Sequence, residues 1–136
     1  MFNIIQVDIP SLLNYQIFAP TLLRIAVAMM IGGMAFKHYS SRAALSTVRF
    51  PVVGAGAWII WLSVVVEALV ALGLLFGYHT QIFAIIGALI GLKHLIWFGK
   101  YPQYFIYERP TAFFILIICL SLLLSGAGHW AMDLPF

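Results

Sequence analysis

Two oppositely charged residues lie inside long apolar stretches of this 136-residue chain. Glu67 stands well within the apolar run 52–76. An ionised carboxylate in hydrocarbon is destabilising unless it is paired, hydrated or protonated. Arg24, near the start of the run 17–36, is the one obvious cation for it, so the sequence predicts an Arg24–Glu67 ion pair. This pair either fixes the packing of two helices or forms part of a ligand-binding pocket.

Further polar side chains follow the second and fourth apolar runs and are expected to join the charged pair. If the runs form antiparallel helices, these two ends lie on the same side of a membrane as the start of the first helix. The sequence therefore predicts an intramembrane polar pocket composed of Arg24, Glu67, Thr80, His129 and Asp133. Arginine and histidine can donate hydrogen bonds to the carbonyl groups of a quinone. A carboxylate can relay the protons that quinone reduction consumes.

A second polar group is expected at the opposite ends of the helices, at the inner face. Its residues are Lys37, His38, Lys93, His94, Glu108 and Arg109. We expect the pocket around Glu67, and not this group, to be the functional site, because the pocket contains the two charges that lie within the membrane.

The four histidines raise the question of a haem or metal centre. No two of them are spaced i, i+3 or i, i+4, and no cysteine accompanies them. We therefore expect exposed histidines at the membrane interface and no metal site. The chain also has no phosphate-binding loop, nucleophile elbow or dinucleotide fingerprint, so no catalytic residue is assigned. Any redox group must come from a partner protein or be a diffusible quinone, since no intrinsic cofactor is predicted.

The elements that position these residues follow from composition. Hydrophobic residues make up 64% of the chain and charged residues only 8%, against roughly 25% charged residues in an average soluble domain. Four apolar runs approach the length of a membrane-spanning helix. The sequence predicts an all-α, integral membrane, four-helix transmembrane bundle that forms a single domain, 1–136. The expected helices are 17–37, 52–77, 81–98 and 109–125, with short interfacial helices in 1–16 and 39–51.

The orientation of this bundle is predicted from the loop charges. Apart from Arg24 within the first helix, every lysine and arginine lies in or next to the loops after the first and third helices, and the turn 77–81 has none. Because basic loops face the cytoplasm, both termini are expected on the exterior or periplasmic side of the inner (cell) membrane. The net charge of +3 has the same explanation and does not indicate nucleic acid as a partner.

Two G-x-x-x-G patterns lie on consecutive helices. The first is Gly73–Gly77 and the second is Gly87–Gly91. Such patterns let helix backbones approach closely. They predict a tight hairpin of the second and third helices, and contacts within a homo-oligomer are the alternative use of the same glycines.

Several short motifs together resemble the DoxX family of small membrane proteins. They are Glu67-Ala-Leu-Val-Ala-Leu-Gly73, Gly77-Tyr-His-Thr80, Tyr107-Glu108 and Gly126-Ala-Gly-His-Trp-Ala-Met-Asp133, with Arg24, Gly33 and Lys37 in the first helix. The match covers about residues 21–133. The chain has Gln81 and His129 where the family commonly has arginine, and Ala127 where it commonly has proline.

The resemblance implies a four-helix membrane protein associated with oxidoreductase systems, since the family takes its name from a thiosulfate:quinone oxidoreductase. Two functions follow as hypotheses. The chain is a membrane subunit linked to a quinone-dependent redox system, or it is a non-enzymatic scaffold or assembly factor that docks partner proteins. Its expected partners are the lipid bilayer and a redox partner protein. A co-purifying quinone or redox protein would favour the first hypothesis.

Overall fold

The computed structural model describes residues 15–49, 54–102, 104–105, 107–128 and 131–132 of the chain. Most of the interfacial helix expected in 1–16 therefore lies outside the described residues. Within the described ranges, four long helices and two short helical turns follow one another. They are η1 (Gln16–Phe18), α2 (Ala19–Ser40), α3 (Arg42–Leu45), α4 (Ala57–Phe76), α5 (Thr80–Trp97) and α6 (Arg109–Ser125).

Proline and glycine set several of the helix ends. Proline occupies the first turn of both α2 and α6, where its missing N–H leaves no intrahelical bond unmade. Helix α4 ends at Gly77, whose left-handed backbone (φ 67°) lets the N–H of Tyr78 bond to the carbonyl of Gly73 at 3.0 Å. The expected helix 52–77 begins only at Ala57, because Gly54 (φ 78°) and the extended Gly56 precede it.

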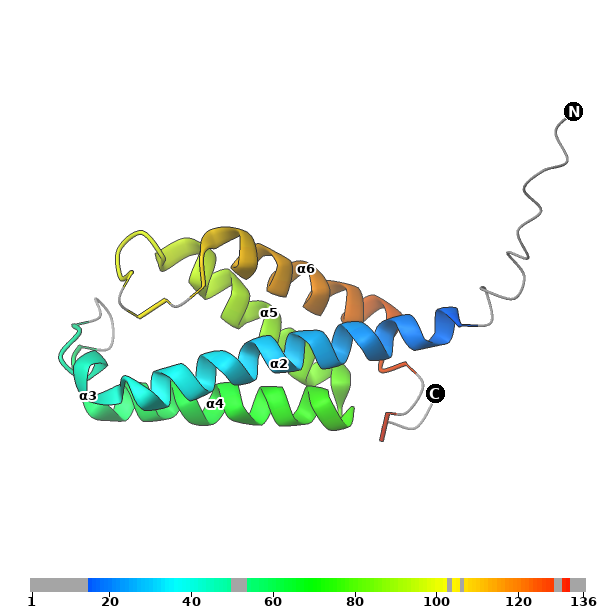
Figure 1. Ribbon diagram of the computed structural model, residues 1–136, viewed down its shortest axis with the longest axis horizontal. Coiled ribbons are helices and arrows are strands. Elements are labelled where there is room, and N and C mark those ends of the chain that lie inside the picture. Colours follow the sequence, from blue (N-terminus) through cyan, green and yellow to red (C-terminus); the bar gives the residue numbers. More distant parts are fainter. Residues whose placement is uncertain (1–14, 50–53, 103, 106, 129–130, 133–136) are drawn as a thin grey trace, which may run out of the picture.

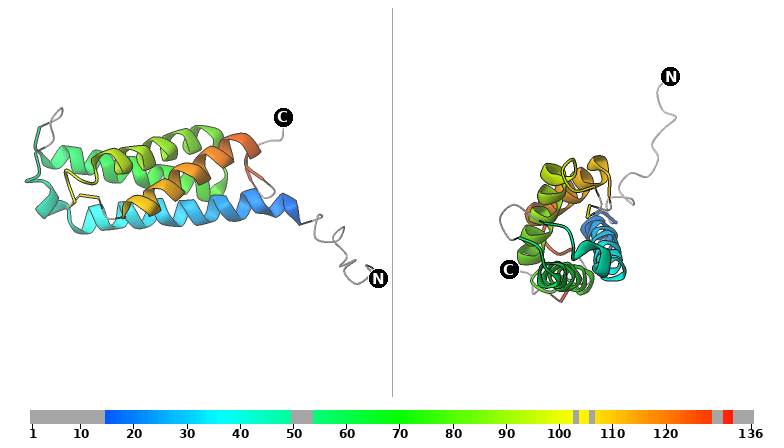
Figure 2. Two further views of the ribbon diagram at one scale, coloured as in Figure 1. Left: turned by 90° about the horizontal axis from the view of Figure 1, so that it is seen from above. Right: turned by 90° about the vertical axis from the view of Figure 1, so that its left-hand side faces the viewer.

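The four long helices run alternately up and down and pack side by side (Figures 1 and 2). The most extensive contacts join α2 with α4 and α5 with α6, and further contacts join α2 with α6 and α4 with α5. The end-on view in Figure 2 shows the helices surrounding a shared interior. Buried residues from all four helices fill it, including Ile31, Val70, Ala84 and Leu122.

The outer surfaces of the helices are strongly apolar. Large hydrophobic side chains such as Leu22, Leu69, Ile96 and Phe114 are each at least half exposed. Three helical segments, Gln16–Ser40, Ala57–Phe76 and Thr80–Trp97, are long and apolar enough to cross a bilayer, and Arg109–Ser125 is a shorter apolar helix. These features indicate a multi-pass membrane protein.

The glycines pack differently from the hairpin that the sequence predicts. Gly73 does face α5, because a Cβ there would collide with the ring of Phe83. Gly91 instead faces α6, where a Cβ would lie 3.1 Å from the carbonyl oxygen of Ala112, and Gly77 faces Arg24 and Ala131. The assignment of these two glycines to the contact between α4 and α5 is wrong. Gly87 faces the shared interior, where a Cβ would lie 2.8 Å from Sγ of Cys119 on α6 and 3.7 Å from Val70 on α4.

A second, smaller core covers the end of the helices at which α2 stops and α4 starts. Leu45 of α3 and Ile60 of α4 are buried there with Tyr104 and Phe105 from the connector between α5 and α6. The connector lies at the same end as α3 in Figure 1. It brings Tyr104 over the ends of α2 and α5, where the polar site lies.

Candidate functional site

Glu67 has its closest charged partners at the end covered by α3 and the connector. Its side chain is 1% exposed. One carboxylate oxygen, Oε2, lies 2.6 Å from Nδ1 of His38 on α2, and the other, Oε1, lies 3.8 Å from Nζ of Lys93 on α5. The Arg24–Glu67 pair predicted from the sequence is therefore wrong.

The relative positions of α2 and α4 explain this difference. The two helices are antiparallel, and Gly32 of α2 lies opposite Ala71 of α4. Moving four residues back along α4 from this contact reaches Glu67, and moving six residues forward along α2 reaches His38. Arg24 is fourteen residues before His38, or about 21 Å away at 1.5 Å per residue.

Arg24 belongs to the opposite end of the molecule. Its side chain is 2% exposed, and a guanidinium nitrogen donates a hydrogen bond of 2.9 Å to the carbonyl oxygen of Ala127, which follows α6. Thr80 is buried at the start of α5, at this same end. The predicted pocket is thus divided between two ends of the molecule, and His129 and Asp133 lie outside the described residues.

His38 is fully buried and both of its ring nitrogens have partners. Nε2 lies 2.8 Å from the main-chain carbonyl oxygen of Tyr104, and the two rings stack with centroids 4.5 Å apart. A carbonyl oxygen can only accept a hydrogen bond, so Nε2 of His38 must carry a hydrogen and donate it. This contact fixes the orientation of the imidazole ring.

The contact between His38 and Glu67 therefore contains one proton. At 2.6 Å, two lone pairs would repel, so either Nδ1 donates to a carboxylate or a protonated carboxyl donates to Nδ1. In both descriptions the same proton lies between the same two atoms. The pair can release or accept this proton, which is the chemistry of a general acid and base.

Lys93 and Tyr104 extend this pair toward solvent. The ammonium group of Lys93 donates to the hydroxyl oxygen of Tyr104 at 3.4 Å, and that hydroxyl also bonds to Oγ of Ser63. The side chain of Lys93 is 28% exposed, whereas those of His38 and Glu67 are almost completely buried. The cluster thus runs from a buried acid–base pair to a partly exposed cation.

His94 is the one residue of the predicted inner group that is buried beside the cluster. Its Nδ1 donates to the carbonyl of Ile90 at 3.0 Å, and its ring lies edge-on to Phe105. Nε2 is then an acceptor, and it has no hydrogen-bond partner among the described residues. Exposed histidines were expected, which is wrong for His38 and His94, whereas His79 is exposed.

His38 and Lys93 of the predicted inner group thus form the cluster with Glu67, whereas its remaining members do not enter it. Lys37, Glu108 and Arg109 are exposed. The sequence signal for the site is the pair of Lys-His dipeptides at the ends of α2 and α5. These helices run in the same direction, so their ends meet, and each dipeptide contributes a buried histidine.

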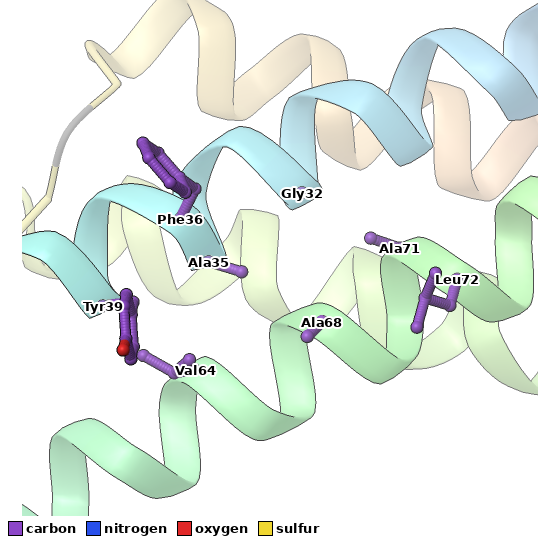
Figure 3. Close-up of a pocket in the computed structure, with 8 residues that line it drawn as sticks. All are labelled: Gly32, Ala35, Phe36, Tyr39, Val64, Ala68, Ala71 and Leu72. Carbon is purple, nitrogen blue, oxygen red and sulfur yellow. The ribbon is translucent and has the colours of Figure 1, made fainter.

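An apolar groove lies on the outer side of the same helices. It has a volume of about 350 Å³ and is open to the outside. Figure 3 shows the short side chains of Ala35, Ala68 and Ala71 facing the space between α2 and α4, with Tyr39 and Val64 close together at one end. Tyr39 follows His38 and Ala68 follows Glu67 in the sequence, so the groove lies along the same turns of α2 and α4 as the polar pair.

Comparisons with known proteins found no matching family model, no matching curated protein and no matching solved structure. Among the described residues, no group of three or more histidine, cysteine, aspartate or glutamate side chains is arranged to hold a metal ion.

Proposed function

We propose that this chain is an integral membrane subunit of the DoxX type that serves a quinone-dependent oxidoreductase system. In this proposal α2, α4, α5 and α6 all span the membrane. The observation that carries it is the buried His38–Glu67 pair with its single shared proton. The motifs around Glu67 and Gly77 that resemble the DoxX family support the same conclusion.

The pair suits quinone chemistry because electron transfer to a quinone is coupled to proton uptake. A buried acid–base pair can supply or remove one proton at a fixed position. The electrons would come from a redox group of a partner protein. The residues of this chain would orient the quinone and exchange its protons.

The groove in Figure 3 supports a lipid-soluble ligand. Its lining is almost entirely apolar, and it includes Tyr39 and Ala68, which follow His38 and Glu67 in the sequence. A quinone that entered from the bilayer could place its ring near Tyr39 and its tail along the small side chains of the groove.

Quinone binding can be tested with the short-tailed analogue decylubiquinone and the purified protein in detergent. We expect wild type to bind it and Ala68→Phe to lose binding, because the added ring fills the groove. Leu69→Phe is the matched control, since Leu69 is the next residue of α4 and is exposed outside the groove. Failure of wild type to bind decylubiquinone, or equal binding by both variants, would contradict the proposal.

The proposed orientation places the end with α3 in the cytoplasm. Cysteines introduced at Ser41 and at Ala131 would lie on opposite sides of the membrane, in a background with Cys119→Ser. In intact cells, an impermeant thiol reagent should label the cysteine at position 131 and leave the one at position 41 unlabelled. The reverse pattern would invert the orientation.

A scaffold function is the second candidate, and the exposed basic residues at the proposed cytoplasmic end favour it. They are Lys37, Arg42, Arg49, Lys100 and Arg109. A docking surface for an acidic partner would use these charges and would not need the buried pair. Charge reversal at Arg42 and Lys100 should then abolish co-purification of a partner, whereas His38→Gln should not.

A further inference from the structure

Among the described residues, the polar contacts of the His38–Glu67 pair lead toward one end of the molecule. Toward the end with α3, Glu67 approaches Lys93, and Lys93 bonds to Tyr104. Toward the opposite end, the neighbouring described residues of the interior are apolar. Ile31 and Met34 of α2 and Val70 and Leu74 of α4 are each at most 1% exposed and fill that space.

Lys93 is the link between the buried pair and solvent. Its ammonium group is 3.8 Å from Oε1 of Glu67, about 1 Å longer than a charge-assisted hydrogen bond. Oε1 has no hydrogen-bond partner among the described residues, so it is open to this approach. The side chain of Lys93 is also partly exposed, so its ammonium protons can exchange with water.

We propose that Lys93 transfers the shared proton of the His38–Glu67 pair to and from the aqueous phase at the end of the molecule with α3. Lys93 first releases one proton to water and becomes a neutral amine. The protonated carboxyl group of Glu67 then turns about its Cγ–Cδ bond, so that the oxygen carrying the shared proton faces Lys93, and the neutral amine takes the proton from it. The sum of the two steps moves one proton from the pair to water, with no electron transferred and Lys93 returned to its charged form.

Tyr104 positions Lys93 for this transfer. Its hydroxyl accepts a hydrogen bond from the ammonium group and is itself held by Ser63. Its main-chain carbonyl holds His38, which is a separate contact. A Tyr104→Phe substitution therefore removes the anchor of Lys93 while the carbonyl remains and the stacked ring is kept.

The transfer can be measured by NMR on protein with ¹⁵N-labelled histidine. The proton between Nδ1 of His38 and Glu67 is identified as the resonance that Glu67→Gln abolishes, and its exchange with water is followed by saturation transfer. We expect Lys93→Met to slow this exchange by about 10²-fold, a typical contribution of a positioned proton-transfer group. Tyr104→Phe should slow it less.

Lys93→Arg separates proton transfer from charge. Arginine keeps the positive charge near Glu67 but does not release a proton in proteins. Exchange as slow as in Lys93→Met supports the proposal, and exchange at the wild-type rate overturns it. If Lys93→Met does not fold, Lys93→Arg alone decides between these outcomes.

Two control variants remove similar groups outside the cluster. Lys37→Met removes the exposed ammonium group next to His38 in the sequence. Tyr107→Phe removes a hydroxyl that donates to the carbonyl of Met30 at 3.1 Å; burial raises the pKa of this phenol, so it stays protonated. In both variants the proton of the His38–Glu67 pair should exchange with water at the wild-type rate. If either variant slows this exchange as much as Lys93→Met does, the proposal is overturned.

This inference rests on the proposed proton-handling role of the pair but does not depend on quinone binding. The NMR measurement contains no quinone, whereas the decylubiquinone experiment reports no proton exchange. Wild-type protein that does not bind decylubiquinone but shows exchange through Lys93 would reject the quinone proposal and keep this one. Wild-type protein that binds decylubiquinone but shows no exchange through Lys93 would reject the role of Lys93 and keep the quinone proposal.

Discussion

Each of the two ends of the molecule buries a charged side chain, but the groups that bond to this side chain differ between the ends. Glu67 is bonded to the side chain of His38 and lies near that of Lys93, and both partners can gain or lose a proton. In the described part of the chain, Arg24 donates to the main-chain carbonyl of Ala127, and a carbonyl cannot gain or lose a proton in this way. Burial of a charge in an apolar helix therefore does not by itself indicate chemistry. The nature of the partner atoms distinguishes an acid–base site from a contact that fixes the chain.

The two ends are also covered by different segments. The connector after α5 covers the Glu67 end and supplies both the carbonyl and the hydroxyl of Tyr104. The segment after α6 covers the Arg24 end, where Gly128 packs against Thr21 and the N–H of Met132 bonds to the carbonyl of Phe76. Among the described residues, the connector contributes a side-chain hydroxyl to the site, and the contacts of Ala127 and Met132 in the segment after α6 come from its main chain.

The largest effect on stability is expected at the Glu67 end. His38→Leu leaves Glu67 buried without its closest partner, which should lower the free energy of unfolding by about 3–5 kcal/mol. Protonation of Glu67 in the variant would offset part of this loss. Unfolding in mixed micelles of detergent and SDS measures the change. The double variant His38→Leu with Glu67→Leu should recover much of the loss. Wild-type stability in the single variant would show that the pair is not stabilising.

A smaller effect is expected for Arg24→Met at the other end. Loss of its charged hydrogen bond to Ala127 should cost about 1.5–3 kcal/mol of unfolding free energy. Because the two sites are about 20 Å apart along α2, this cost should add to that of Glu67→Gln within about 0.5 kcal/mol. A larger coupling in the double variant would show that the two ends are not independent.

The smallest effect is the expected difference in stability between alanine substitutions at two glycines that both have a left-handed backbone. An alanine at Gly54 has open space around its Cβ, whereas one at Gly77 would collide with the guanidinium group of Arg24 and lie 2.8 Å from Cα of Ala131. Both substitutions carry the strain of a positive φ, about 1–2 kcal/mol. Gly77→Ala should cost about 1 kcal/mol more than Gly54→Ala, as expected for overpacking. Equal melting temperatures for the two variants would show that the Arg24 end can rearrange freely.

The sequence alone determined the helical elements of this protein, because the signals for them are local. The expected helices 81–98 and 109–125 differ from α5 and α6 by at most one residue at each end. Gly77 and Gly126 mark where α4 and α6 end, and Pro110 marks where α6 starts, whereas the start of α4 lies five residues after the expected one. The apolar composition likewise indicated a multi-pass membrane protein, as the exposed apolar surface does.

The tertiary structure decided which polar residues meet. The lengths of the apolar runs do not specify how far α2 and α4 are shifted along each other. That shift places the side chain of Glu67 against His38 and not against Arg24. The periodicity of the glycines likewise does not reveal that Gly91 faces α6. The return of the connector, which buries Tyr104 over His38, depends on packing against Leu45 and Ile60 from distant parts of the chain. These pairings are set by side-chain packing between helices, and the sequence of each helix by itself leaves them open.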